Sequence, residues 1–296
     1  MRFGLTTPVV TLVPRRHAFW EESAGTAALQ QIAQTADRLG FYHLTCSDHV
    51  AVPVEVAKLR GSRYYDPFST LGFLAAITQQ IRLVTHVLVL PYHHPLEVAK
   101  RLGTLDQLSH GRVIAGVGVG TLREEFEVLG ADFEGRGARY EDGLQALRAA
   151  LGQRQPSYRG SHFSFESMIV DPCAMQEHMP IWLGGRTMRS LRRALRFADG
   201  WDPFGLSVDQ IERMLSKVRN LREWQSRDSF ALVFPAEQLI DVDGAAAITV
   251  TVDQLARYER LGTTHMNLQF RSRSLDQLLE QMATFSEMVM PRFAAT

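Results

Sequence analysis

The alternation of short apolar segments with longer amphipathic ones constrains the fold of this chain most strongly. Eight strand candidates begin near residues 2, 41, 81, 112, 180, 199, 229 and 264, and most segments between them have helical periodicity. This alternation predicts a parallel sheet with helical crossovers. Eight strands favour an α/β fold closed into a (β/α)8 TIM barrel over an open sheet, in a single domain over residues 1–296.

One segment interrupts this alternation between the fourth and fifth strands. Residues 152–180 are turn-rich and lack helical periodicity. Within them, Tyr158, Phe163 and Phe165 flank Arg159-Gly160-Ser161, which indicates a small hairpin. Long irregular insertions in compact barrels are often functional loops. We therefore expect this insertion to be a lid or a substrate loop.

Charge and cysteine content exclude several classes of function. Lys+Arg and Asp+Glu both number 32, and the sequence has no basic stripe. We therefore expect no nucleic-acid partner. No apolar run approaches membrane-spanning length. The two cysteines and the histidines match no metal-ligand spacing, so no metal site is expected. Pro8 and Pro14 interrupt the N-terminal segment, so we do not expect it to be a secretory signal. With only two cysteines, we expect a cytoplasmic protein, and we expect it to act on a small molecule.

TIM-barrel active sites lie at the C-terminal ends of the strands, which limits the candidate catalytic residues. Asp48 and His49 form an adjacent acid–histidine pair after the second strand. We predict that His49 transfers a proton or stabilises charge, and that Asp48 orients it. The alternative, in which Asp48 caps a turn and His49 only packs, stays open. Glu124, Glu125 and Glu127 are interpreted as solvated carboxylates of a helix's first turn.

Two glycine-rich segments follow predicted strands. The sequence GVGVG at 116–120 is followed by Thr121, and Gly184-Gly185-Arg186-Thr187 precedes a predicted helix. The first matches neither the dinucleotide-binding fingerprint nor a P-loop. Glycines before a helix allow backbone N–H groups to approach an anion, so two such segments predict a phosphate-binding site. The glycines would alternatively serve only to make tight turns.

Several segments together resemble the bacterial luciferase-like family. Within that family, the chain is most similar to the deazaflavin-dependent oxidoreductases, which use coenzyme F420. The resemblance weakens after Trp201. It implies a (β/α)8 barrel with an insertion over the active site, and a flavin or deazaflavin ring in the barrel mouth. The segments that carry it are SDH at 47–49, IRLVTHVLVLPYHHPLEVAKRLGTLDQLSHGRVIAGVGVG at 81–120, RG at 136–137, PIWLGGRT at 180–187 and ADGW at 198–201.

The resemblance also implies particular site residues. It places Asp48 and His49 against the cofactor ring and a non-prolyl cis peptide at His86-Val87 in a bulge of the third strand. Members that oxidise sugar phosphates carry a Trp after the histidine and a Glu after the third glycine, which this chain lacks, so glucose 6-phosphate is not the expected substrate. A homodimer is implied as well. The implied phosphate contacts are Gly118, Val119, Gly120, Thr121, Gly184, Gly185, Arg186 and Thr187.

Three functions remain open at the level of sequence. The first is an F420-dependent oxidoreductase that transfers a hydride to or from a small organic substrate. The second is an FMN-dependent monooxygenase, with a separate reductase that supplies reduced flavin. The third is a non-catalytic flavin- or deazaflavin-binding protein. A groove for the polyglutamate tail of F420 would favour the first, and the basic residues that would form it are Arg186, Arg189, Arg192 and Arg193.

Overall fold

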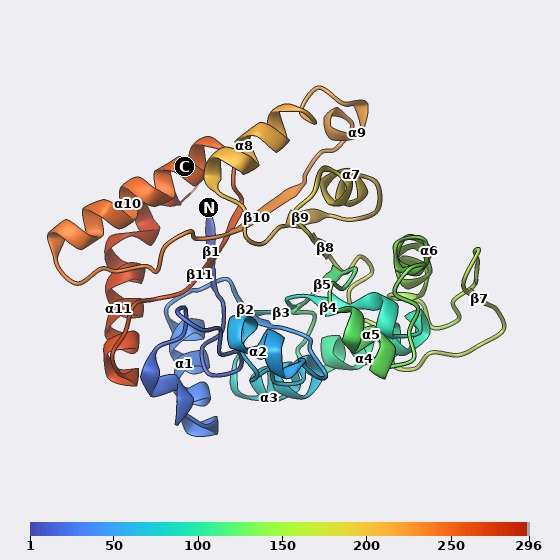
Figure 1. The fold of residues 1–296 in the computed structure, drawn as a ribbon, viewed down its shortest axis with the longest axis horizontal. Coiled ribbons are helices and arrows are strands. Elements are labelled where there is room, and N and C mark those ends of the chain that lie inside the picture. Colours follow the sequence, from blue (N-terminus) through green and yellow to red (C-terminus); the bar gives the residue numbers. More distant parts are fainter. Residues whose placement is uncertain (295–296) are drawn as a thin grey trace.

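The computed structural model of the protein describes residues 1–294 and has a closed barrel of eight parallel strands at its centre (Figure 1). The barrel closes where β1 pairs with β11 and where β3 pairs with β5. A short strand, β4 (Leu88–Val89), continues beyond β3 and also pairs with β5. The predicted TIM barrel is confirmed. Its strands are β1 (Arg2–Leu5), β2 (His43–Cys46), β3 (Arg82–Thr85), β5 (Val113–Gly118), β8 (Ile181–Gly184), β9 (Gly200–Asp202), β10 (Ala231–Pro235) and β11 (His265–Leu268).

Helices surround the barrel and bury their apolar faces against it (Figure 1). In α1, the side chains of Leu29, Ile32, Ala33 and Ala36 are buried, as their spacing predicts. Full burial of each large aliphatic side chain contributes roughly 1.5–3 kcal/mol. The α-helices are α1 (Thr26–Arg38), α2 (Val54–Arg60), α3 (Pro67–Ile77), α4 (Pro95–Leu108), α5 (Arg123–Val128), α6 (Arg136–Ala150), α7 (Met188–Phe197), α8 (Val208–Ser216), α9 (Arg222–Gln225), α10 (Ala245–Arg260) and α11 (Leu275–Met288). Short 3-10 helices are η1 (Phe19–Glu22), η2 (Leu90–Tyr92) and η3 (Met290–Phe293).

The barrel interior is layered. An apolar layer at mid-height contains Val84, Ile114, Trp182 and Val233, which are all nearly inaccessible to solvent. Strand periodicity places every second residue inside the barrel, so the interior positions nearer the C-terminal ends belong to the next layer. That upper layer is polar, and it forms the floor of the candidate site.

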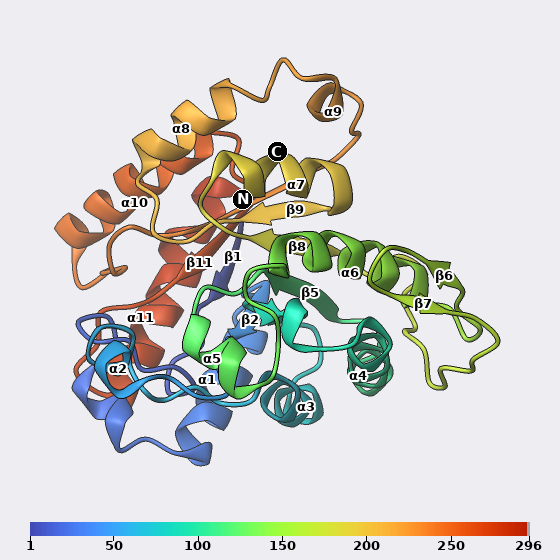
Figure 2. The ribbon, with the colours of Figure 1, turned by 45° about the vertical axis from the view of Figure 1, so that its right-hand side comes forward.

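The insertion between α6 and β8 lies against α4 and α6. The predicted hairpin is present as β6 (Tyr158–Arg159) and β7 (Ser164–Phe165). It lies beside α6, at the edge of the molecule and away from α2 and α5 (Figure 2). Asp142 of α6 accepts hydrogen bonds from the Tyr158 hydroxyl and from three backbone N–H groups of residues 161–163. Phe163 of the insertion lies 5.3 Å from the ring of His94, at the start of α4, and the role of the insertion as a lid or a substrate loop stays a prediction.

The sequence patterns did not predict every helix. Neither α2 nor α10 was expected. The run from Ile248 to Val252 in α10 is mostly β-branched, which favours a strand locally. Burial of Leu255 and Tyr258 against the barrel stabilises the helix instead.

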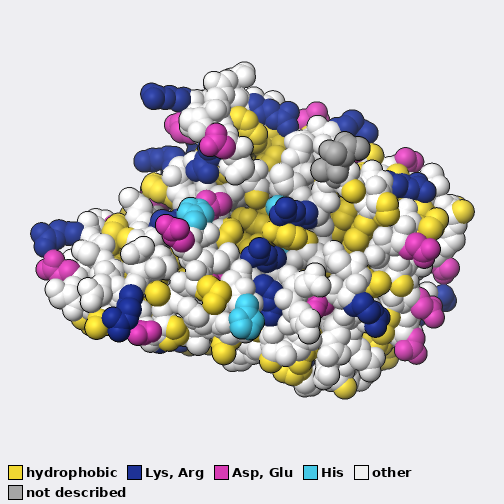
Figure 3. Space-filling view, turned by 180° about the vertical axis from the view of Figure 1, so that it is seen from behind, with side chains coloured by type: hydrophobic (Ala, Val, Ile, Leu, Met, Phe, Trp, Pro, Cys, Tyr) yellow, Lys and Arg dark blue, Asp and Glu magenta, His cyan; other side chains and the backbone are white. Residues whose placement is uncertain are grey.

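Charged side chains of both signs are interspersed over the face opposite that of Figure 1 (Figure 3). This distribution agrees with the formal net charge of zero. Within residues 1–294, no helix combines the length and apolarity needed to cross a membrane.

Candidate active site

His49 lies just beyond β2 and is held by a carboxylate from a different part of the chain. Its Nδ1 is 2.8 Å from Oε2 of Glu125, in α5. The other oxygen of Glu125 accepts the backbone N–H groups of Val50 and Ala51, and the Tyr92 hydroxyl donates to Oε2 at 2.9 Å. His49 Nε2 makes no hydrogen bond within residues 1–294 and is not among the buried atoms that lack a partner, so it is open to solvent.

Glu125 is therefore a buried anchor. The interpretation of this residue as a solvated carboxylate is wrong, because Glu125 is only 1% exposed. Burial alone would raise its pKa, but the hydrogen bonds from His49, Tyr92 and Ala51 hold that pKa below its ordinary value. Glu125 thus stays ionised and fixes the orientation of His49, the role predicted for Asp48.

Asp48 has a different partner. Its side chain is nearly buried and accepts the backbone N–H of Val89 at 3.0 Å. Nε2 of His93 lies 3.7 Å from the same carboxylate oxygen. Asp48 therefore ties the end of β2 to β4, directly after the bulge.

The bulge at the end of β3 confirms one prediction from the resemblance, because the His86-Val87 peptide bond is cis. The Val87 side chain points to the ends of two neighbouring strands. A Cβ added to Gly118 would lie 2.6 Å from Val87 Cγ2, and one added to Gly184 would lie 3.1 Å from Val87 Cγ1. Both glycines thus make room for Val87, a packing reason that the sequence patterns did not identify.

The floor of the barrel mouth is a connected polar layer. His86 Nε2 lies 3.1 Å from Oδ2 of Asp202, at the end of β9. Asn267 of β11 donates from Nδ2 to Asp202 Oδ1 at 3.2 Å. Nε2 of His43 lies 2.5 Å from Asn267 Oδ1. Among these residues only His86 had been singled out by the sequence analysis. Contacts between residues as distant as 43 and 267 leave no local pattern.

Two interior histidines are neutral at physiological pH. Burial lowers the pKa of His43 to about 4 and that of His265 to about 3. Gly4 leaves space for His43, since a Cβ at this glycine would lie 2.4 Å from the imidazole ring. A neutral His43 that donates from Nε2 fixes the amide orientation of Asn267, which then directs its N–H toward Asp202.

The glycine-rich segments end in exposed polar groups. Gly120 and Gly185 have φ values of 77° and 114°, so both turns require glycine. Arg60, at the end of α2, donates from Nη1 to the Thr121 hydroxyl at 3.1 Å. The guanidinium of Arg186 is exposed, and its Cζ lies 5.5 Å from the centre of the Phe204 ring. Tight turns and packing account for these glycines, and phosphate binding stays a prediction.

The remaining predicted positions divide between exposed and structural roles. Val119 is half-buried beside the turn. The Thr187 hydroxyl accepts the N–H of Ser190 and caps α7. Arg193 is buried and binds Glu141 through Nε and Nη2, which removes it from a tail-binding groove.

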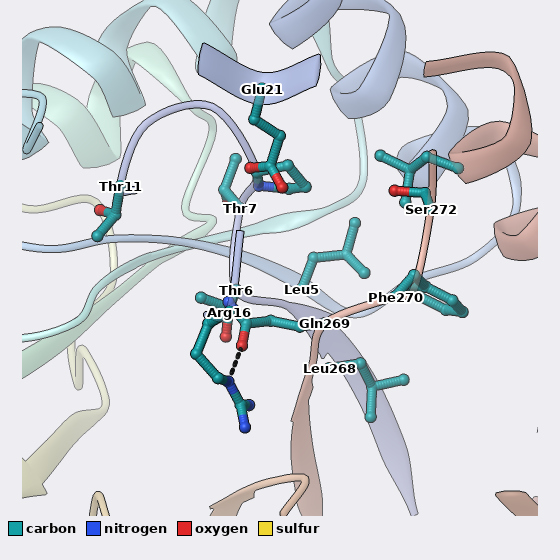
Figure 4. Close-up of a pocket in the computed structure, with 12 residues that line it drawn as sticks. Leu5, Thr6, Thr7, Thr11, Arg16, Glu21, Leu268, Gln269, Phe270 and Ser272 are labelled. Carbon is teal, nitrogen blue, oxygen red and sulfur yellow. Dashed lines mark hydrogen bonds between the residues drawn. The ribbon is translucent and has the colours of Figure 1, made fainter. Parts of the chain in front are cut away.

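A small pocket lies at the C-terminal ends of β1 and β11 (Figure 4). Arg16 donates from Nε to Gln269 Oε1 at 2.9 Å, and Glu21 accepts the N–H of Val9. The pocket volume of about 20 Å³ suits a single water molecule.

TIM-barrel enzymes carry their active sites at the C-terminal ends of the strands. In this chain, the same end of the barrel carries a histidine held by a carboxylate and two glycine turns. Residues 1–291 match the family model of the luciferase-like monooxygenases, and the chain belongs to this family. The uncharacterised protein Rv0940c of Mycobacterium tuberculosis is 30% identical over 253 residues, which are 81% of this chain and 84% of that one. Limonene 1,2-monooxygenase of Rhodococcus erythropolis is 38% identical over 140 residues, 47% of this chain and 34% of that one.

Solved structures share the fold at lower identity. Monooxygenase RslO1 from Streptomyces bottropensis superposes with a TM-score of 0.78 and 23% identity, over 99% of this chain and 100% of that one. An F420-dependent secondary alcohol dehydrogenase has a TM-score of 0.76 and 14% identity, over 99% of each chain. The oxygenating constituent of 3,6-diketocamphane monooxygenase from Pseudomonas putida, in complex with FMN, has a TM-score of 0.74 and 13% identity, over 99% and 98%.

Proposed function

We propose that this protein is an oxidoreductase that uses coenzyme F420 to transfer a hydride to or from a small organic substrate. The arrangement of His49 and Glu125 carries the proposal. An ionised, buried carboxylate holds Nδ1 of the histidine and leaves Nε2 open at the end of the barrel where active sites lie. The similarity to an F420-dependent alcohol dehydrogenase supports the choice of cofactor.

The residues at the strand ends fit a cofactor that carries phosphate. The Thr121 hydroxyl and the Arg60 guanidinium lie together at the end of one glycine turn, and Arg186 is exposed at the other. These groups would hold the phosphate, and the residues around the His86-Val87 bulge would contact the ring. The bound deazaflavin would supply or accept the hydride.

His49 would handle the accompanying proton. With Nδ1–H donated to Glu125, the lone pair of Nε2 accepts a proton from a substrate hydroxyl during oxidation, and the imidazolium returns it during reduction. Glu125 would hold the ring in this orientation, as a buried carboxylate does in other acid–base pairs. Asp48 keeps the end of β2 and the bulge in place.

An FMN-dependent monooxygenase is the second candidate. Its support is the similarity to limonene 1,2-monooxygenase and to the monooxygenase RslO1. In that case the partner would be a separate reductase, and the same residues would hold the phosphate of FMN. We also infer a homodimer, from the resemblance alone.

A fluorescence titration of the purified protein with F420, FMN and riboflavin separates these candidates. Tight binding of F420 with weak binding of FMN supports the first, and preferential binding of reduced FMN supports the second. Binding without turnover of alcohols, ketones or activated alkenes would leave a non-catalytic carrier. Riboflavin lacks the phosphate, so it should bind at least about tenfold more weakly than FMN if the glycine turns hold phosphate. Equal binding of FMN and riboflavin would contradict the phosphate site.

A matched pair of variants on α2 tests the phosphate contact itself. Arg60→Ala should weaken FMN binding without changing riboflavin binding. Lys58→Ala, on the same helix but paired with Glu55, should change neither. If Arg60→Ala weakens both ligands equally, Arg60 shapes the site without touching phosphate.

A further inference from the structure

His86 is a second histidine that a carboxylate holds at the mouth of the barrel. Its Nε2 lies 3.1 Å from Oδ2 of Asp202, whose side chain is completely buried, and 3.3 Å from Nδ2 of Asn267. Asp202 Oδ2 makes no hydrogen bond within residues 1–294, and the His86 side chain keeps 18% of its surface exposed. His86 Nδ1 makes no hydrogen bond within residues 1–294 and is not among the buried atoms without a partner, so it is open to solvent. The two ring nitrogens thus have different tasks: one faces the buried acid and the other faces the mouth.

The charges around this pair make His86 the cation. Asp202 has no Lys or Arg partner among the described residues, and His86 is the one titratable cation at ion-pair distance from it. Asn267 is neutral, and the neighbouring His43 and His265 stay neutral above about pH 4 and pH 3. A buried carboxylate without a cation would be strongly destabilising. Burial lowers the pKa of His86, but the charge of Asp202 outweighs it and leaves that pKa raised.

We propose that His86 is a cofactor-binding cation, held in place by Asp202, that contacts the negatively charged ring of a bound deazaflavin or reduced flavin. The inference rests on the proposed function, which puts the cofactor at this end of the barrel. The F420 ring bears an ionisable hydroxyl, and reduced FMN loses a ring proton near neutral pH. In both, the negative charge spreads over the ring. An imidazolium that is shielded from water beneath such a ring stabilises the ionised form.

The test measures ionisation of the bound ring. The protonated and ionised forms of F420 absorb at different wavelengths, so a pH titration of the complex gives the pKa of the bound ring. His86→Gln should raise this pKa by about one unit, a tenfold change in proton affinity. If the protein binds FMN instead, the variant should weaken binding of reduced FMN about tenfold relative to oxidised FMN, whose ring is neutral.

Two further variants make the test decisive. His86→Gln leaves the buried Asp202 carboxylate without its cation, and this variant could fail to fold for that reason. The double variant His86→Gln/Asp202→Asn removes the carboxylate as well and is the second test. It should shift the ring pKa in the same direction but by less, because the repulsive carboxylate is also gone. His178→Gln, at an exposed histidine remote from the mouth, should leave the ring pKa unchanged.

The outcomes separate this inference from the proposed function. If the wild-type protein binds neither F420 nor FMN, both are wrong. If it binds one of them and neither His86 variant alters the ring ionisation or the preference for reduced FMN, the proposed function stands and the role of His86 is overturned.

Discussion

At the scale of single residues, the site depends on which carboxylate meets which histidine. The sequence located His49 through the position of active sites in barrels. It did not locate Glu125, since 76 residues separate the two side chains and an acidic helix start has a simpler explanation. Likewise, the contact between Asp202 and His86 required the closed barrel.

Replacement of Glu125 tests its positioning role. Glu125→Gln keeps an oxygen for the N–H groups of Val50 and Ala51 but loses the carboxylate that holds His49 Nδ1. Once the substrate is known, kcat should fall about 10- to 100-fold while KM changes little. Nitrogen-15 NMR should show the His49 proton redistributed between its ring nitrogens. Glu124→Gln, at the exposed neighbouring position, is the control. An unchanged kcat and tautomer would exclude a positioning role.

At the scale of elements, the bulge after β3 and the strand ends beside it form one packed unit. Because a Cβ at Gly118 would lie 2.6 Å from Val87, Gly118→Ala should destabilise the protein by about 1–3 kcal/mol. The double variant Gly118→Ala/Val87→Ala should cost less than the sum of the single changes. Urea unfolding of the four proteins measures the coupling.

A glycine in a different environment provides the control. A Cβ at Gly72, within α3, would meet nothing within 4 Å. Gly72→Ala should therefore stabilise the protein by roughly 0.5–1 kcal/mol.

Strictly additive effects of Gly118→Ala and Val87→Ala on the free energy of unfolding would contradict the prediction, because they would show that the two side chains do not compete for the same space.

We expect that the hairpin β6–β7 does not contribute to cofactor binding. Asp142→Ala removes the acceptor of three backbone N–H groups in residues 161–163. Their hydrogen exchange should accelerate, while the Kd of the cofactor should change less than about twofold. Glu166→Gln, exposed at the end of β7, should affect neither quantity. A tenfold loss of cofactor affinity in Asp142→Ala would contradict this prediction and show that the insertion contributes to cofactor binding.

Prediction of the elements succeeded where periodicity and tertiary packing agree. The strands and α1 follow directly from the order of apolar positions. The helix α10 does not, since its β-branched run favours a strand until burial against the barrel is counted. The lid prediction, which stays untested, rests on a general tendency of long insertions, and that tendency does not specify which end or face of the barrel an insertion covers.

At the scale of the whole molecule, the neutral histidines inside the barrel make stability depend on acidity. His43 and His265 have pKa values lowered from 6.5 to about 4 and about 3. Below pH 6.5 the unfolded chain therefore binds protons at these histidines that the folded barrel does not bind. Their contribution to the free energy of unfolding is fully present above pH 6.5 and falls as the pH drops toward 4. His86 has the opposite sign, since its raised pKa favours the folded state below pH 6.5 and that contribution is lost at higher pH.

Urea unfolding at pH 7.5 and pH 5 tests this dependence. The pKa shift of His43 corresponds to a loss on the order of 3 kcal/mol by pH 4, and about half of that loss falls between pH 6.5 and pH 5. His43→Gln should lower stability at pH 7.5, because the hydrogen bond to Asn267 is disturbed, but it should flatten the pH dependence. A variant whose stability falls as steeply as that of the wild type between these pH values would contradict the prediction.

The position of the insertion has a practical consequence. Residues 166–169 are exposed directly after the hairpin strands. A fluorescent dye, an affinity peptide or a surface tether grafted at this loop would report on or immobilise the protein without replacing a buried side chain. Comparison of cofactor binding by the grafted and the unmodified protein would also show whether the insertion covers the site.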